Sequence, residues 1–360
     1  MMTERELELI EALSNAKGPS GFEDETVAII REALSGVCDL EEDSLRNLYI
    51  RHKGKGGSKP VVMLDAHSDE VGFMVQAIRP TGTLRVVGLG HWNTAALPGT
   101  RVLVRNRFRE WIPGCIAAKP PHFMSAAERE RRGAPEVRDL AIDIGATSPQ
   151  EAEEVFGIQI GEPVVAATRF RYDRERDVMF GKAFDCRIGC AACAEVMLRL
   201  ADEPLEVDLV ASLSAQEEVG ERGCKVAVNR IRPDAAIVLE GCPADDTFGE
   251  AYMMQTKLKH GPMLRFMDTT VICNPRFQRF ALDLALSHGL PAQASVREGG
   301  GNDAAAIQTL LNGAPSIVMG VPVRYIHGPE CIATYRDYEA TVELAMAVIR
   351  ALNADAIRGF

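Results

Sequence analysis

Long apolar runs and an excess of basic charge are both missing from this 360-residue sequence. No stretch reaches the roughly 20 apolar residues that a bilayer-spanning helix needs, and the first residues lack the basic and apolar segments of a signal peptide. The formal net charge of −11 argues against nucleic acid or an anionic membrane as a partner. We therefore expect a cytoplasmic protein.

An even set of closely spaced cysteines is also missing. The nine cysteines are scattered and odd in number, which suits a reducing compartment better than a disulfide framework. Hydrophobic residues make up 46% of the chain and charged residues 25%, as in a globular protein with a large core. The length suggests two domains, or one domain with a substantial insertion.

Apolar periodicity predicts an α/β fold at both ends of the chain. Two amphipathic helices are expected first, one around Leu7–Leu13 and one around Val27–Leu34, and the second is preceded by a capping pair, Ser20 and Glu23. The continuous apolar run Pro60–Ala66 is typical of a buried parallel strand. After residue 166 the same rhythm returns, with strands expected at 207–213, 235–240 and 316–320 and helices at 187–201, 275–288 and 339–352.

Residues 70–165 have a different character. Short β-rich runs in this block are separated by glycine and proline turns, at the spacing of an all-β structure. We expect a small β-barrel-like insertion here. Residues 1–69 and 166–360 would then form one discontinuous α/β domain.

Metal-capable side chains recur where predicted strands end and turns begin. The apolar run from Leu209 breaks into Glu217 and Glu218, and two acids at the end of a buried strand are costly unless a cation is present. His67 and Asp69 follow another apolar run, Asp185 opens a predicted helix, Glu240 closes a third run and His327 lies in a turn.

Each of these residues alone has an ordinary explanation, such as a turn histidine, a helix cap or a solvated loop. Together they form a nitrogen and oxygen donor set suited to Zn²⁺, Co²⁺ or Mn²⁺. Two such ions about 3.5–4 Å apart can stabilise the attacking and leaving oxygens of a hydrolysis. A carboxylate not needed as a ligand could serve as the general base.

Several short motifs, spread almost from end to end, carry a family resemblance. They are Gly18-Pro-Ser-Gly21, Leu64-Asp-Ala-His-Ser-Asp-Glu-Val-Gly-Phe-Met74, Pro113-Gly-Cys-Ile116, Lys119-Pro-Pro-His122, Asp143-Ile-Gly-Ala146, Asp185-Cys-Arg187, Gln216-Glu-Glu-Val-Gly220, Gly299-Gly-Gly-Asn-Asp303 and Tyr325-Ile-His327. In this order they resemble the dinuclear-metal aminopeptidases, the family of bacterial glutamyl aminopeptidases and archaeal tetrahedral aminopeptidases, often named endoglucanase M.

The resemblance implies a mixed-sheet α/β/α metallopeptidase domain with an inserted β domain for dimerisation. It also implies an enzyme that removes N-terminal residues from short peptides, using water activated by two divalent ions. Zinc is the expected metal, with cobalt or manganese as alternatives. A homo-oligomer is expected, at least a dimer and in some members a dodecamer.

The resemblance also implies a role for each site residue. Asp185 would bridge the two ions, and His67 and Glu240 would hold the first. Glu218 and His327 would hold the second. Glu217 would be the general base, and Asp69 would orient His67.

The sequence departs from the family pattern at three positions. Glu240 stands where the family usually has Asp, and in the wider superfamily Glu there accompanies carboxypeptidases, so a carboxypeptidase or another amide hydrolase is an alternative. Cys186 follows the bridging Asp where a second Asp is usual, and its thiol is either a soft ligand or a buried inert group. Asn302 replaces a common Thr.

Three other functions remain open from the sequence. Cys186, Cys190 and Cys193 have the C-x3-C-x2-C spacing of an iron–sulfur radical enzyme, although the same spacing places them on one face of a helix. A glycosidase would need two acids about 5–10 Å apart and would leave the histidines unused. A catalytically silent relative would keep the fold without turnover.

Overall fold

The computed structural model describes residues 4–53, 58–126 and 133–360. Thr3, which pairs with Glu6 as a predicted capping box of the first helix, lies outside these ranges. The chain divides into two compact units, which we call the α/β unit (Met1–Glu70, Phe170–Ile326 and Cys331–Phe360) and the barrel unit (Val71–Arg169 and His327–Glu330). The division expected from the sequence, 1–69 with 166–360 against 70–165, stays a prediction for the domains, and it did not foresee that His327–Glu330 falls in the barrel unit.

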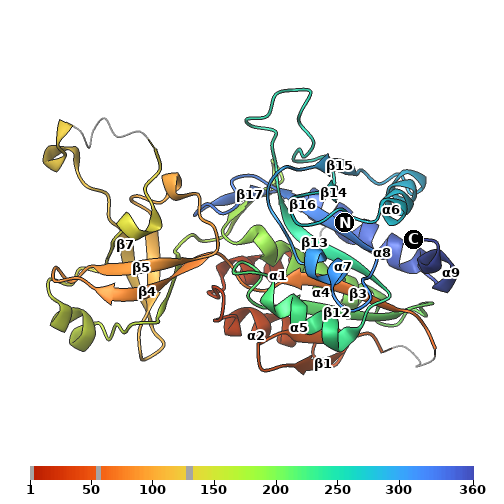
Figure 1. Ribbon diagram of the computed structural model, residues 1–360, viewed down its shortest axis with the longest axis horizontal. Coiled ribbons are helices and arrows are strands. Elements are labelled where there is room, and N and C mark those ends of the chain that lie inside the picture. Colours follow the sequence, from red (N-terminus) through yellow and green to blue (C-terminus); the bar gives the residue numbers. More distant parts are fainter. Residues whose placement is uncertain (1–3, 54–57, 127–132) are drawn as a thin grey trace. The chain divides into compact units, whose positions relative to one another are not determined.

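An eight-stranded mixed sheet forms the centre of the α/β unit (Figure 1). In spatial order its strands are β1 (Asp39–Glu42), β2 (Leu48–Arg51), β12 (Asp208–Ser214), β3 (Val61–His67), β13 (Ala235–Pro243), β16 (Ser316–Val323), β14 (Met263–Met267) and β15 (Gln293–Val296). Strands β12, β3, β13 and β16 run parallel to one another. Their carboxyl ends therefore meet at one edge, where His67 pairs in register with Ser214.

Helices cover both faces of this sheet, and that is why its central strands are mainly apolar. Along β3, Val62, Leu64 and Ala66 pack into the larger core and Met63 into the smaller one. The larger core includes α1 (Glu4–Asn15), α2 (Asp24–Ala33), α4 (Phe184–Leu200), α6 (Pro275–Ser287) and α8 (Tyr335–Ala351), and the smaller includes α5 (Arg222–Ile231) and α7 (Ala304–Thr309). Helix α9 (Ala354–Arg358) ends the chain.

A second, three-stranded sheet in the same unit pairs β10 (Arg171–Asp173), β11 (Val178–Gly181) and β17 (Cys331–Ala333).

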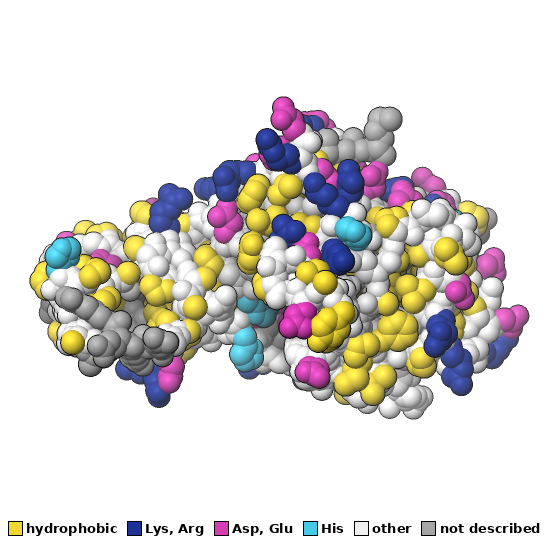
Figure 2. Space-filling model, turned by 90° about the horizontal axis from the view of Figure 1, so that it is seen from above, with side chains coloured by type: hydrophobic (Ala, Val, Ile, Leu, Met, Phe, Trp, Pro, Cys, Tyr) yellow, Lys and Arg dark blue, Asp and Glu magenta, His cyan; other side chains and the backbone are white. Residues whose placement is uncertain are grey.

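Acidic and basic side chains are interspersed over the face of the molecule shown in Figure 2, with apolar patches between them. Among the described residues, no helix combines the length and the hydropathy needed to cross a membrane.

The barrel unit contains a closed barrel of six strands. They are, in order around the barrel, β4 (Gly72–Ile78), β5 (Leu84–Leu89), β8 (Ile142–Asp143), β7 (Trp111–Ile116), β6 (Arg101–Arg105) and β9 (Pro163–Ala166). Its connections carry the 3₁₀ turns Thr94–Ala96, Pro121–Phe123 and Val137–Asp139 and the π-helical turn Glu151–Val155. Alternate residues such as Phe73, Val75, Val102 and Val104 fill the interior, as a barrel requires.

The capping pair predicted for α2 is wrong. The residue that precedes α2 is Glu23, and its side chain makes no capping hydrogen bond. Glu23 Oε1 instead accepts hydrogen bonds from the backbone amides of Gly21 and Gln216, at 2.7 and 3.2 Å. Ser20 Oγ donates to Asp69 Oδ2 at 2.6 Å. Both residues therefore stabilise contacts with distant segments instead of closing their own helix.

Candidate metal centre

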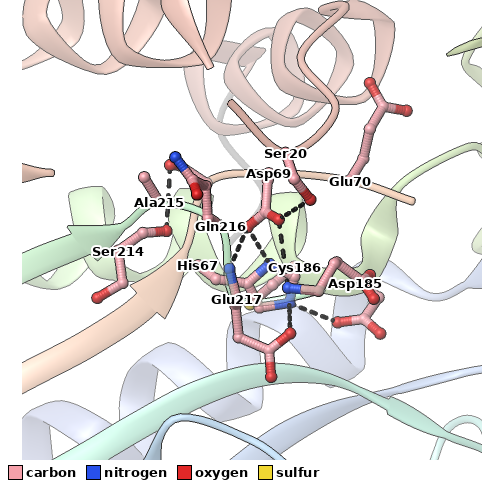
Figure 3. A network of polar contacts seen from close by, with 12 residues as sticks. Ser20, His67, Asp69, Glu70, Asp185, Cys186, Ser214, Ala215, Gln216 and Glu217 are labelled. Carbon is pink, nitrogen blue, oxygen red and sulfur yellow. Dashed lines mark hydrogen bonds and ion pairs between the residues drawn. The ribbon is translucent and has the colours of Figure 1, made fainter. Parts of the chain in front are cut away.

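His67 lies at the centre of a group of acids at the carboxyl edge of the sheet (Figure 3). The ring is buried, and its Nε2 atom lies 3.0 Å from Asp185 Oδ1. The Oε2 atoms of Glu240 and Glu217 are 3.8 and 3.9 Å from the same nitrogen. Its Nδ1 atom is 3.3 Å from Asp69 Oδ1, which is long for a hydrogen bond.

Asp185 reaches His67 from the irregular first turn of α4. Ala183, which precedes this helix, has a left-handed backbone with φ of 56°, and Asp185 itself is non-helical with φ of −84° and ψ of 106°. The cap residue of α4 is Ala183, so the structure does not support the interpretation of Asp185 as a helix cap. The irregular turn directs the Asp185 carboxylate toward the imidazole.

Asp69 fixes the turn that carries the two adjacent glutamates. Its carboxylate is buried and accepts the backbone amides of Glu217 at 3.0 Å and Glu218 at 3.2 Å, in addition to the Ser20 hydroxyl. Burial opposes the charge of Asp69, but the neighbouring His67 ring, followed by the hydrogen bonds from Ser20 and the Glu217 amide, holds the pKa of the carboxyl below its usual value. Asp69 thus ties together β3, the segment before α2 and the turn after β12.

Backbone geometry brings Glu217 and Glu218 toward the same centre. A fully extended pair would point to opposite faces. Here Gln216 has a left-handed φ of 57° and Gly220 a φ of 119°, so the chain turns around the two acids. One ligand atom from each glutamate and one from His67 lie within 4.8 Å of one another. Glu218 is buried, whereas the side chain of Glu217 keeps 14% of its surface exposed.

Glu240 is an acid inside a strand that is otherwise apolar. It lies in β13, level with Gly320 of β16, and is 5% exposed. Its Oε1 atom is buried and has no hydrogen-bond partner among the residues that the structure describes. Burial raises the pKa of Glu240 well above its usual value, His67 opposes that shift, and the nearby Asp185 and Glu217 add to it.

The structure therefore brings five predicted ligand or base residues together within the α/β unit: His67, Asp185, Glu217, Glu218 and Glu240. His327 belongs to the barrel unit. It lies in the turn after β16 with a left-handed φ of 57°, and its Nδ1 atom is 2.6 Å from the carbonyl oxygen of His91. Its pairing with Glu218 stays a prediction.

The electrostatics of this centre fit a divalent cation. Burial raises the pKa of Glu217 to about 7, opposed by His67 and supported by Asp69 and Asp185. Burial alone would lower the pKa of His67, but the groups around it, Cys186 and Glu217 foremost, raise that pKa well above normal. Several carboxylates crowded in a buried space repel one another when they are ionised, and a single imidazolium cannot neutralise them all. A cation coordinated by imidazole and carboxylate would relieve this repulsion and use the unpartnered oxygen of Glu240.

A buried ion pair that was not predicted from the sequence, between Lys182 and Glu70, lies next to the segments that form the centre. Lys182 Nζ donates to both oxygens of Glu70, at 2.7 and 2.6 Å, and Glu70 Oε1 also accepts the Gly18 amide at 3.1 Å. Burial lowers the pKa of Lys182 to about 8, and Glu70 opposes that shift. Because Glu70 follows Asp69 and Lys182 precedes the Asp185 turn, the pair joins the two segments that deliver these aspartates.

The cysteines of the C-x3-C-x2-C segment do not face a common point. Cys186 Sγ donates to the Leu239 carbonyl at 3.1 Å, and Cys190 Sγ donates to the His67 carbonyl at 3.0 Å. Among the described residues, Cys186 is the one of the three that belongs to a group able to hold a metal, with His67, Asp185 and Glu240. The geometry thus gives no support to an iron–sulfur cluster.

Comparisons of the sequence and of the structure with known proteins lead to one and the same family of aminopeptidases. The model of the M42 glutamyl aminopeptidase family matches residues 47–344. The glutamyl aminopeptidase of Lactococcus lactis is 32% identical over 349 residues, with 97% of each chain covered.

Two solved structures extend the comparison. A TET aminopeptidase from a marine sediment archaeon of the Thaumarchaeota has a TM-score of 0.94 at 35% identity, with 99% of each chain covered. The TET1 peptidase of Pyrococcus horikoshii, described as able to assemble into a tetrahedron or a large octahedral shell, has a TM-score of 0.86 at 27% identity. It covers 96% of this chain and 100% of its own. The chain belongs to the M42 glutamyl aminopeptidase family and is a peptidase with its mixed α/β fold.

Proposed function

We propose that this peptidase is a metal-dependent aminopeptidase that removes N-terminal residues from short peptides with the aid of two divalent ions. The observation that carries the proposal is the convergence of one imidazole and four carboxylates on a buried edge of the sheet. Zn²⁺ is the metal we expect, and Co²⁺ and Mn²⁺ suit the same donors. When bound, such ions lower the pKa of water and stabilise developing negative charge.

Each protein residue would contribute a separate part of this chemistry. Asp185 would bridge the two ions, His67 and Glu240 would hold the first, and Glu218 and His327 would hold the second. Asp69 would orient His67, because its carboxylate lies beside Nδ1 and leaves Nε2 directed at the centre.

Glu217 would be the general base. It is the most exposed of the clustered glutamates, so it can reach a water molecule that enters from solvent. Its pKa of about 7, raised by burial, is close to the value at which a carboxylate accepts a proton and releases it again near neutral pH. The proton taken from water would then be available for the departing amino group.

The decisive experiment is an assay of the metal-loaded protein with aminoacyl chromogenic substrates and with peptides blocked at the amino end. We expect cleavage of the substrates with a free amino group only. Glu217→Gln should lower kcat by about 10²–10⁴-fold while the metal content stays unchanged. Glu221→Gln, in the same turn but outside the proposed set, serves as the matched control.

Other outcomes would point to other functions. Removal of carboxyl-terminal residues from blocked peptides would indicate a carboxypeptidase and would contradict our assignment. Activity on glycosides that survives a chelator would indicate a glycosidase. Full activity in Glu217→Gln would remove Glu217 from the role of base.

We also propose that the chain forms a homo-oligomer in which the inserted block, residues 70–165, makes the dimer contact. The family relatives that assemble support this proposal. Four large apolar side chains among the described residues of the barrel unit are more than half exposed in the single chain: Phe108, Phe123, Val155 and Ile160, with 59%, 73%, 73% and 73% of their surface accessible. Exposed apolar side chains of this kind are typical of surfaces that a partner covers.

A further inference from the structure

The thiol of Cys186 shares a small buried volume with three of the proposed metal ligands. One ligand atom from each of His67, Asp185, Cys186 and Glu240 lies within 4.8 Å of all the others. Ligand atoms around one zinc ion stand about 3–4 Å apart, as follows from zinc–ligand distances of about 2.0–2.3 Å. His67 Nε2 already lies 3.0 Å from Asp185 Oδ1 and 3.8 Å from Glu240 Oε2, within that range.

The backbone places this thiol beside Glu240. Cys186 follows Asp185 in the irregular turn, with φ of −115° and ψ of 29°, before α4 becomes regular. Its Sγ atom donates to the carbonyl oxygen of Leu239, the residue before Glu240 in β13. Gly189 allows this close approach, because a Cβ atom there would collide with Cys186 Sγ and with the Leu239 carbonyl. The sulfur is thus held between helix and strand on the side of the centre where Glu240 lies.

The unsatisfied oxygen of Glu240 also marks this side of the centre as a place for a cation. Its Oε1 atom is buried without a hydrogen-bond partner among the described residues, although a buried carboxylate oxygen is costly to leave unsatisfied. Cys190, one turn further along α4, is equally buried, but its sulfur is directed at the His67 carbonyl and, within the described part of the chain, belongs to no such group. Of these two neighbouring thiols, that of Cys186 lies among the proposed metal ligands and that of Cys190 does not.

Without a cation, Cys186 is an ordinary neutral thiol. Its Sγ atom donates a hydrogen bond to the Leu239 carbonyl oxygen at 3.1 Å, so the sulfur carries its proton. A divalent cation changes this, because a coordinating thiol gives up its proton to solvent as the metal–sulfur bond forms. No oxidant or reductant is needed for that exchange.

We propose that Cys186 is a further protein ligand of the ion held by His67, Asp185 and Glu240, in addition to the position that the water needs, which makes this a nitrogen, oxygen and sulfur site selective for thiophilic ions such as Zn²⁺. The inference rests on the metal-dependent function proposed above. It predicts a metal preference that carboxylates and imidazole alone would not produce, since thiolate favours zinc over manganese.

Cobalt reports on the sulfur directly. The full-length protein is stripped with a chelator, and Co²⁺ is added stepwise while the absorption spectrum is recorded. We expect the weak visible bands of bound Co²⁺ together with an intense near-ultraviolet band from thiolate-to-cobalt charge transfer. Cys186→Ser should keep the visible bands and lose the near-ultraviolet band, and Cys190→Ser should keep both. In competition between Zn²⁺ and Mn²⁺, Cys186→Ser should reduce the preference for Zn²⁺ about tenfold or more.

The possible failures are distinguishable. Visible cobalt bands without a charge-transfer band in the unsubstituted protein would overturn the role of Cys186 and leave the proposed function standing. Failure to bind Co²⁺ at all would overturn the proposed function. If Cys186→Ser does not fold, Cys186→Ala is the second variant, and serine variants of Cys190 and Cys193 assign the band by elimination.

Discussion

At the scale of single residues, the hydroxyl of Ser20 supports the metal centre through Asp69. Asp69 accepts this hydroxyl and the amides of both glutamates, so its orientation depends on Ser20. We predict that Ser20→Ala lowers the free energy of unfolding by about 1.5–3 kcal/mol, because a hydrogen bond to a buried charged acceptor is lost. Thermal unfolding measures the change, with the exposed Ser35→Ala as control. Equal melting temperatures for the two variants would show that the Ser20 contact contributes nothing.

Glu23 gives a residue-scale prediction about pH. Burial, aided by Asp69, raises its pKa from 4.5 to about 7, so the folded state holds an extra proton between these two values. Stability must therefore fall as pH rises from about 5 to 7 and level off above that range. Glu23→Gln removes this dependence and should be the more stable protein at pH 8, by at most about 3 kcal/mol.

Melting temperatures of both proteins between pH 5 and 8 test this prediction for Glu23. The curves should converge toward pH 5 and separate toward pH 8. Curves that stay parallel across the range would mean that Glu23 does not titrate there.

Residue types at the ends of apolar runs were predictable, and their partners were not. His67 ends the largely apolar strand β3, and Glu240 interrupts the largely apolar strand β13. A polar residue next to an apolar run can be recognised in the sequence. Ser20 and Glu23 have the spacing of a capping box, so the sequence pattern wrongly predicted that they cap α2. Their actual partners, Asp69 and Gln216, belong to segments that only the folded chain brings near.

At the scale of elements, the contact between α4 and β13 decides where Asp185 and Cys186 lie. Gly189 is one point of close approach, because a Cβ atom there would meet the backbone of Leu239. Alanine usually stabilises a helix relative to glycine, but here we predict that Gly189→Ala lowers the free energy of unfolding by about 1–3 kcal/mol. It should also weaken metal binding, since the helix must move away from the strand. Gly299→Ala, which has open space around it, is the matched control for both measurements.

The strands of the central sheet were largely predictable, whereas their order was not. Strands β3, β12, β13 and β16 appear within a few residues of the expected ranges, because each is buried on both faces and mainly apolar. Strands β14 and β15 escaped notice, since short runs such as Gln293–Val296 carry no clear pattern. Helix α8 begins at Tyr335, earlier than expected, because the Thr334 side chain accepts the amide of Asp337 and caps it. The confirmed mixed α/β fold therefore came from local pattern and family resemblance together.

At the scale of the whole molecule, the exposed apolar residues of the barrel unit should control assembly. We predict that Phe108→Glu and Ile160→Glu lower the molar mass measured by light scattering, because a charge would be buried without a partner in the proposed contact. Leu286→Glu, at an 81% exposed apolar position on α6 in the α/β unit, should leave the mass unchanged. A protein that is monomeric before any substitution would contradict the proposed oligomer.

The discontinuous build of the α/β unit has a consequence for synthesis on the ribosome. β3 ends at His67, but its parallel neighbours β12 and β13 begin only at Asp208 and Ala235. The nascent chain must keep this apolar strand unpaired while the entire barrel segment emerges, and exposed strands of that kind invite aggregation. Nascent protein should therefore depend on chaperones until residue 243 has left the exit tunnel, and translation that stalls between these strands should yield insoluble fragments.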